Sequence, residues 1–373
     1  MLTVVLALIA VGFAIGWPMT MIMRRVGARF RALDTPGSRG HIKQEIRPVP
    51  NTGGMAIYLA VALPMLAGIL AILFVPASVW EERLPAAAPH LPRLGETLPT
   101  AIALLVTMSC LHLLGLIDDR RPLGPYIKLG VQIAAAALMA IWFDVRLLEL
   151  LDDTIPGASI VITVVWIVAI TNAINFLDNM DGLAGGVSAI AAGLLMAATI
   201  INEQWFIAAT LALLLGGLIG FLMLNFPPAK IFMGDGGSLV IGFLLAVLTA
   251  RTTFYHADLG GAWYGVFMPV IILAIPLYDF ASVTLIRIRQ RKSPFVGDQQ
   301  HFSHRLVQRG LSKRGAVIVI WSFAAVTGIG GVSLGQLEPW QAALVFVQTG
   351  LVLLTIAILE YTGRKSARKD RAL

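Results

Sequence analysis

Long apolar blocks recur along the whole chain, and this pattern limits what the chain can fold into more than any other feature. Each block is about 20 residues long, which as an α-helix crosses the hydrocarbon layer of a membrane. In lipid the backbone must satisfy its own hydrogen bonds, so each block should be helical. Charged residues make up only 13% of the 373 residues, whereas soluble domains have about 25%. The pattern predicts an all-α, polytopic integral membrane protein.

Eleven of these blocks are candidate transmembrane helices. They cover residues 2–22, 53–76, 99–117, 128–147, 158–177, 182–202, 204–224, 238–257, 263–285, 315–336 and 339–360. We expect residues 1–373 to form a single membrane-embedded domain that ends in a basic tail, 361–373. The first block is too long for a signal-peptide core and has no clear small-residue cleavage site, so we interpret it as the first span.

The basic residues predict how the chain is oriented in the membrane. Of the 28 Lys and Arg residues, 24 fall in loops on the side that includes the tail. Because basic loops stay in the cytoplasm, we expect the amino terminus outside and the carboxyl terminus in the cytoplasm. The membrane we expect is the cell's inner (cytoplasmic) membrane. The net charge of +7 follows from this bias and suits anionic lipid. The basic residues are spread over short loops without an aromatic stacking motif, so we expect no nucleic-acid partner.

Four segments on the inner side place carboxylates, amides or imidazoles at one membrane depth. They contain Asp118 and Asp119, then Asn172, Asn175, Asp178 and Asp181, then Asp235, and finally His301, His304 and Arg305. Carboxylates at a membrane boundary are costly unless they face water, a cation or a partner. Asp and Asn oxygens suit Mg²⁺, which takes few protein ligands and completes its shell with phosphate oxygens. The set predicts Mg²⁺-assisted phosphoryl transfer at the inner face.

Spacing adds one structural expectation, and two further polar residues lie inside expected spans. Asn175, Asp178 and Asp181 recur every three residues, and on a helix such neighbours share a face. We therefore expect them to point into one cleft. An ionisable residue inside a span is a functional candidate. We interpret Asp279 as bordering the cleft and favour a core role for His112.

The order of these motifs resembles the polyprenyl-phosphate N-acetylhexosamine-1-phosphate transferases, and most closely their undecaprenyl-phosphate N-acetylglucosamine-1-phosphate branch. The motifs are Asp-Asp at 118–119, Asn-Ala-x-Asn-x-x-Asp-x-x-Asp-Gly-Leu-Ala from 172, Gly-Asp-x-Gly-Ser from 234 and Asp-x-x-His-x-x-His-Arg-Leu from 298. Residues 34–36 and 47–54 resemble the family's first cytoplasmic loop. The sequence departs from many relatives at Ser303, where they have a further histidine.

The resemblance implies an activity and its partners. The enzyme would transfer N-acetylglucosamine-1-phosphate from a UDP-sugar to undecaprenyl phosphate at the cytoplasmic face and release UMP. This is the first membrane step of cell-envelope polysaccharide synthesis, such as that of lipopolysaccharide. Mg²⁺, or Mn²⁺ in its place, would be held by Asn175 and Asp235. The partners would be the polyprenyl phosphate lipid, the UDP-sugar and the bilayer, and a homodimer is compatible with the sequence.

The resemblance also implies a role for each site residue. Asp118 would deprotonate or orient the acceptor phosphate with support from Asp119, and Asp178 and Asp181 would bind metal-bound water or nucleotide. The catalytic residues would be Asp118, Asp119, Asp178, Asp181 and His301, and the residues that would bind substrate groups are Lys43, Arg47, Asn172, His304 and Arg305. His301, His304 and Arg305 would meet the diphosphate or sugar, and Lys43 and Arg47 the lipid phosphate.

Three alternatives remain open from the sequence. Two use the same chemistry: a phospho-MurNAc-pentapeptide transferase, and a transferase for another UDP-amino sugar. The third belongs to a different class, the ion-coupled secondary transporters. Transporters usually place their charges near the bilayer midplane, in broken helices of repeated halves. Here the acids gather at one face, which favours the transferase.

Overall fold

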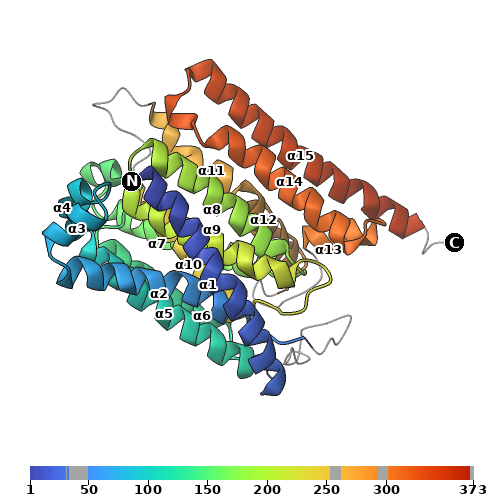
Figure 1. Ribbon diagram of the computed structural model, residues 1–373. Helices are drawn as coiled ribbons and strands as arrows, with labels where there is room; N and C mark the ends of the chain where they lie inside the picture. Colours follow the sequence, from blue (N-terminus) through green and yellow to red (C-terminus); the bar gives the residue numbers. More distant parts are fainter. Residues whose placement is uncertain (31, 33–48, 253–261, 293–300, 370–373) are drawn as a thin grey trace.

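Helices account for most of the chain that the computed structural model describes, which is residues 1–30, 32, 49–252, 262–292 and 301–369 (Figure 1). The longer helices are α1 (Leu2–Arg29), α2 (Gly53–Phe74), α5 (Leu98–Arg120), α6 (Pro125–Trp142), α7 (Ala158–Leu177), α8 (Leu183–Ile201), α9 (Trp205–Asn225), α10 (Asp235–Arg251), α12 (Ala274–Arg289), α14 (Lys313–Gly331) and α15 (Pro339–Lys369). The shorter ones are α3 (Ala77–Arg83), α4 (Leu91–Glu96), α11 (Met268–Ile272) and α13 (Phe302–Gln308).

Membrane-spanning helices dominate this fold. Within the described residues, nine helices are long and apolar enough to cross a membrane, and a bent pair would add a tenth. That pair replaces the expected straight span 263–285, because the chain turns by 68° between Trp263–Ile272 and Ala274–Arg289. Pro276 fits this break, since proline is tolerated in the first turn of a helix but not further inside. The protein is a polytopic, all-helical membrane protein.

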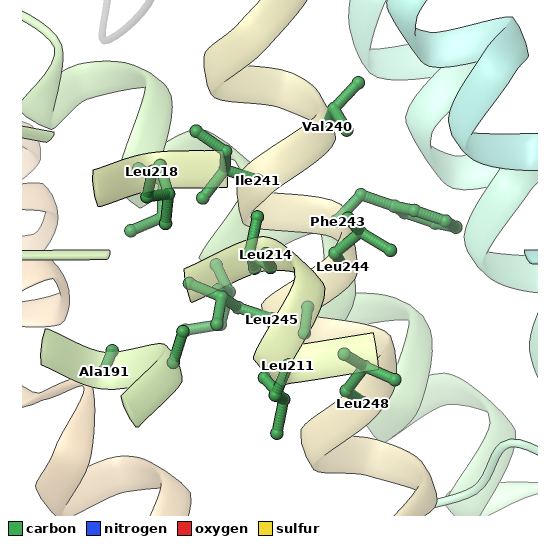
Figure 2. Packing of buried hydrophobic residues seen from close by; sticks show 14 of the residues in the cluster. Ala191, Leu211, Leu214, Leu218, Val240, Ile241, Phe243, Leu244, Leu245 and Leu248 are labelled. Carbon is green, nitrogen blue, oxygen red and sulfur yellow. The ribbon is translucent and has the colours of Figure 1, made fainter. Parts of the chain in front are cut away.

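Helix α10 lies at the centre of the bundle. It replaces the expected span 238–257 and has only 17 residues, whereas a straight span needs about 20. Every residue from Gly236 to Ala250 is buried. Figure 2 shows its side chains packed in one apolar cluster with those of α8 and α9. The labelled members are Ala191, Leu211, Leu214, Leu218, Val240, Ile241, Phe243, Leu244, Leu245 and Leu248.

Small residues let the neighbouring helices approach the start of α10 closely. A Cβ atom on Gly115 of α5 would lie 2.4 Å from the carbonyl carbon of Asp235. A Cβ atom on Gly54 of α2 would lie 2.3 Å from the amide nitrogen of Gly237. Such contacts are typical of packed membrane helices, which lack a hydrophobic driving force and pack through small residues. They place the first residue of α10, Asp235, between the ends of α2 and α5.

The opposite side of the molecule is formed by the last two long helices. Figure 1 shows α14 and α15 side by side along this edge, far from α5 and α6. Only 11% of the apolar stretch of α15 is buried within the chain, and Leu344, Leu351 and Ile358 are exposed. Apolar side chains exposed over such a length suit contact with lipid.

Candidate active site

The site is built around the first turn of α10. Asp235 follows Gly234, whose φ of +72° is a conformation that L-residues with side chains rarely adopt. A Cβ atom at Gly234 would also lie 2.5 Å from both Asn51 Oδ1 and Asp119 Oδ2. The backbone conformation therefore favours glycine here, and a side chain would also displace Asn51 and Asp119. Its conformation directs the chain so that the Asp235 carboxylate emerges where α5, α6 and α7 meet α10.

Asp119 caps this helix from the end of α5. Its Oδ1 accepts hydrogen bonds from the backbone amide of Asp235 at 3.0 Å and from Asn51 Nδ2 at 3.0 Å. Its Oδ2 accepts one from the backbone amide of Gly236 at 3.2 Å. A carboxylate at a helix N-terminus satisfies otherwise unpaired amides and interacts well with the helix dipole. Asp119 thus joins α5, α10 and the Asn51 segment and fixes where α10 begins.

Lys128 links the two other carboxylates of the site. Its Nζ lies 2.8 Å from Asp118 Oδ2 and 2.9 Å from Asp235 Oδ2, and it donates a hydrogen bond to each. Asp118 also accepts a hydrogen bond from the backbone amide of Leu123 at 2.8 Å, through its other oxygen. One ammonium group from the first turn of α6 therefore holds carboxylates from α5 and α10 together.

Asn175 completes this group from the last turn of α7. Its Nδ2 donates to Asp235 Oδ1 at 3.0 Å and to Ser238 Oγ at 2.8 Å. Asn172, one turn earlier, donates to Gln132 Oε1 of α6 at 2.5 Å and to the backbone carbonyl of Val168. The structure thus brings Asp118, Asp119, Asn175 and Asp235 into one hydrogen-bonded group.

The donor set of this group fits a divalent cation. Within the described ranges, no three His, Cys, Asp or Glu side chains form a metal-binding cluster. The candidates are instead two carboxylates, Asp118 and Asp235, and the Asn175 carbonyl. This set is too small to enclose an ion but suits Mg²⁺, which keeps places for phosphate oxygens. The Lys128 ammonium lies between the two carboxylates, so this spot already stabilises a positive charge.

Asp178 and Asp181 do not share a helical face with Asn175, contrary to the expectation from their spacing. Helix α7 ends at Leu177, so both acids lie in the turn before α8. Asp181 Oδ2 accepts a hydrogen bond from the backbone amide of Ala229 at 3.0 Å. Nearby, the Gly182 amide donates to Asn225 Oδ1 at 2.9 Å. These bonds hold the α7–α8 turn against the segment that leads into α10.

The His301 segment covers the same turn from the other side. His301 Nδ1 lies 2.8 Å from Asp279 Oδ2, and both side chains are buried. Ser303 Oγ donates to Asn179 Oδ1 at 2.5 Å, and this hydrogen bond ties α13 to the α7–α8 turn. Burial lowers the pKa of His304 below its usual value, with the nearby His301 adding to the effect.

Of the expected substrate-binding residues that the structure describes, Arg305 lies outside the α10 group, which consists of Asp118, Asp119, Lys128, Asn175 and Asp235. Arg305 of α13 forms an ion pair with Glu360 of α15, with 2.7 Å between Nη2 and Oε1. Lys43 and Arg47, the residues expected at the lipid phosphate, lie outside the described residues. Their roles, like those of the other site residues, stay predictions.

Comparison with known proteins identifies the family. Residues 101–253, which contain the α5, α7 and α10 motifs, match glycosyl transferase family 4. A decaprenyl-phosphate N-acetylglucosaminephosphotransferase of Mycobacterium leprae is 30% identical over 339 residues, which is 83% of this chain and 79% of the relative. The chain belongs to glycosyl transferase family 4. It is an enzyme of the polyprenyl-phosphate N-acetylhexosamine-1-phosphate transferase type.

Two further relatives extend this likeness over nearly the whole transferase. A protein of Bacillus subtilis described as a probable undecaprenyl-phosphate N-acetylglucosaminyl 1-phosphate transferase is 29% identical over 349 residues, covering 92% of this chain and 88% of the relative. An undecaprenyl-phosphate alpha-N-acetylglucosaminyl 1-phosphate transferase of Thermotoga maritima is 29% identical over 317 residues, covering 84% and 86%. The likeness therefore includes the helices on both sides of the site.

Sequence reasoning missed Lys128 and Asn51, two residues of this transferase's site. Lys128 was counted only among the basic residues of the cytoplasmic side, which are common at the ends of spans. The signal that could have found it is its position: it is the one charged residue in helix α6, in the first turn of the helix that follows the Asp118-Asp119 motif. Asn51 lies in the loop motif but reaches Asp119 only because of an isolated parallel bridge between Asn51 and Phe232.

Proposed function

We propose that this transferase moves N-acetylglucosamine-1-phosphate from UDP-N-acetylglucosamine to undecaprenyl phosphate at the cytoplasmic face of the inner membrane. The observation on which this proposal rests is the group of Asp118, Lys128, Asn175 and Asp235, drawn from the ends of four helices. Two anionic phosphates must approach each other in this reaction. A site that combines an ammonium group with oxygen ligands for a cation lowers their repulsion. The names of the relatives supply the sugar and the acceptor lipid.

The proposed reaction is a direct displacement at phosphorus. An oxygen of the acceptor phosphate attacks the β-phosphorus of the UDP-sugar, and the bond from that phosphorus to the bridging oxygen breaks. UMP leaves with the electron pair, and the sugar-1-phosphate stays on the lipid as a diphosphate. A phosphate monoester has a second pKa near 6, so the acceptor is already mostly ionised at neutral pH. Asp118 therefore serves to orient the acceptor more than to deprotonate it.

Different residues of the site would bind the ion and the phosphates. Asp235 and Asn175 would hold Mg²⁺, with Mn²⁺ as a substitute. Asp118 could also bind the ion, because the Lys128 ammonium that lies between Asp118 and Asp235 contacts both carboxylates. When bound, the ion supplies charge neutralisation at the diphosphate. Lys128 can release one carboxylate and contact a phosphate oxygen, because its flexible side chain carries three donors. Asp119 keeps Asp235 in place, since both of its oxygens bind the α10 N-terminus.

An apolar groove gives the polyprenyl chain a place beside this site. A cavity of about 570 Å³ lies between α5 and α6, lined by side chains such as Val106, Ala134 and Ala135. Val131 and Ala135, which also line it, follow Lys128 by three and seven residues on α6. Positions at this spacing share one helix face. A lipid whose phosphate binds Lys128 can therefore extend its tail into the groove.

The same proposal includes the arrangement of the chain in the membrane. Eleven spans result if the bent pair and the short, buried helix α10 each cross the membrane. The amino terminus is then outside and the carboxyl terminus in the cytoplasm, in accord with the bias of basic residues. This orientation puts the α10 group on the side where nucleotide sugars are available.

The test is release of UMP by the purified protein. The protein is incubated with undecaprenyl phosphate and a panel of UDP-sugars, with and without Mg²⁺. We expect UMP only with Mg²⁺ or Mn²⁺, and fastest with UDP-N-acetylglucosamine. A preference for another UDP-amino sugar or for UDP-MurNAc-pentapeptide would replace the sugar in this proposal, and absence of UMP with every donor would overturn it.

A further inference from the structure

Asp279 is a buried carboxylate that no step of the proposed reaction uses. It lies on α12 and is 2% exposed. Its Oδ2 lies 2.8 Å from His301 Nδ1, and its Oδ1 accepts a hydrogen bond from the backbone amide of Phe302 at 2.9 Å. A carboxylate buried without partners would be strongly unfavourable. Here both oxygens are engaged, and both partners belong to the start of α13.

The hydrogen bond with Asp279 determines which nitrogen of the His301 imidazole carries the proton. An ionised carboxylate can only accept hydrogen bonds, so His301 Nδ1 carries the proton that it donates to Asp279. In the neutral ring, Nε2 is then left as an acceptor, and in the protonated ring it is a donor. The orientation of a histidine and the tautomer it adopts are commonly set in this way by a second hydrogen bond.

The surroundings direct this histidine towards the end of α7. The ring of Phe176 meets the His301 ring edge-on, with 6.0 Å between centroids and an interplanar angle of 89°. Phe176 directly follows Asn175, which contacts Asp235. The hydrogen bond between Ser303 and Asn179 holds α13 over the same turn. Asp279 therefore holds a histidine that packs against Phe176, the residue next to Asn175 in the chain.

We propose that Asp279 is the positioning residue for His301 in this transferase. The inference rests on the proposed function and adds a residue to it. Asp279 holds His301 in the tautomer with the proton on Nδ1 and in the orientation that presents Nε2 to the diphosphate or sugar. Asp279 itself does not touch substrate, and all of its effect passes through His301.

The variant Asp279→Asn tests this role with little change of shape. The amide oxygen can still accept from the Phe302 amide, but the NH₂ group then faces His301 and can only donate. His301 Nδ1 must become the acceptor, and the proton moves to Nε2. We expect kcat to fall about 10- to 100-fold, the range found when a carboxylate that orients a histidine is lost. The KM values of both substrates should stay unchanged, and Asp279→Glu, which keeps the acceptor, should recover part of kcat.

A double-mutant cycle separates positioning from structural support. In the His301→Gln background, Asp279→Asn should cause no further loss of kcat, because its effect is transmitted by His301. Ser282→Ala is the matched control: its hydroxyl donates only to the backbone carbonyl of Asp279, so kcat should stay at the wild-type value. Each variant is checked for an unchanged melting temperature.

Distinct results would overturn the inference and the proposed function. Full kcat in a folded Asp279→Asn variant, or a further loss in the His301→Gln background, would overturn the positioning role while the wild-type protein still releases UMP. If Asp279→Asn does not fold, a failure of Asp279→Glu to retain more activity than His301→Gln would do the same. A wild-type protein that releases no UMP would instead overturn the proposed function, and this inference with it.

Discussion

Replacement of Lys128 by methionine is the perturbation whose outcome the structure defines best. The change keeps most of the side-chain volume and removes the ammonium group between Asp118 and Asp235. At 2.8 and 2.9 Å and an effective dielectric constant of about 20, each attraction amounts to about 6 kcal/mol before desolvation is counted. The desolvation of three charged groups offsets much of this sum. The two carboxylates that remain would repel each other.

The net magnitude follows from how buried these groups are. The side chains of Lys128, Asp118 and Asp235 are 24, 13 and 24% exposed. Removing one partner of a buried ion pair costs about 3–5 kcal/mol, and the partial solvent access places this case near the lower value of about 3 kcal/mol. Without a divalent ion, Lys128→Met should therefore unfold at a clearly lower temperature than the wild-type protein.

Mg²⁺ should reverse much of this loss, which distinguishes the explanation from a general packing defect. An ion that binds only the folded state at 100 times its dissociation constant stabilises it by about 2.7 kcal/mol. Since Lys128 no longer competes for the two carboxylates, Lys128→Met should gain more thermal stability from Mg²⁺ than the wild-type protein gains. UMP release should still be slow, because the phosphate loses its ammonium partner.

The assay is thermal unfolding in detergent over a Mg²⁺ titration, with UMP release measured in parallel. Lys292→Met is the control, since Lys292 is an exposed lysine on the side of the protein expected to be cytoplasmic. It should leave both curves unchanged. The reasoning would be refuted if Lys128→Met unfolded at the wild-type temperature without Mg²⁺, or if Mg²⁺ stabilised it no more than the wild-type protein.

The remaining predictions concern three parts of the site. Asp235→Asn should lower kcat/KM about 10²–10³-fold and move the Mg²⁺ activation curve to higher concentration. Asp118→Asn should lower kcat with a smaller change in that activation curve. UMP release measured over a series of Mg²⁺ concentrations gives the rate and the activation curve of each variant. Ala134→Phe in the groove should raise the KM for undecaprenyl phosphate but not the KM for a short prenyl phosphate. The control is Ile133→Phe, at an exposed position outside the groove lining, which should leave both KM values unchanged. Equal KM values of the two variants for undecaprenyl phosphate would contradict a tail in this groove. Gly115→Ala should cost about 1–3 kcal/mol of stability and reduce activity, because its Cβ would lie 2.4 Å from the Asp235 carbonyl carbon; wild-type melting and rate would contradict this close approach.

The spans could be predicted from the sequence because apolar length is a local property. The boundaries expected for 158–177 agree with α7, and most others agree within a few residues. The bend near Leu273 was harder to predict, since the residues on either side are apolar enough for one straight span. The start of α10 at Asp235, earlier than the expected 238, depends on the Asp119 cap, which is a contact between residues distant in the chain.

The candidate site was predictable in its acids but not in its connections. The motifs at Asp118, Asn175 and Asp235 were all expected at one membrane face, and the structure joins them. Lys128 has the sequence context of any basic residue at the end of a span, so only the three-dimensional arrangement shows it between two carboxylates. The spacing of Asp178 suggested a continued helix because no glycine or proline lies between Asn175 and Gly182, yet α7 ends at Leu177.

The central claim is that Asp235 and Asn175 hold a divalent cation where the two phosphorylated substrates meet. Electron paramagnetic resonance of Mn²⁺, titrated into the purified protein with UDP-N-acetylglucosamine present, tests it most directly. A single tight Mn²⁺ site per chain should be present in the wild-type protein and absent in Asp235→Asn, while Lys292→Met keeps it. Equal tight binding of Mn²⁺ by Asp235→Asn and the wild-type protein would contradict the account.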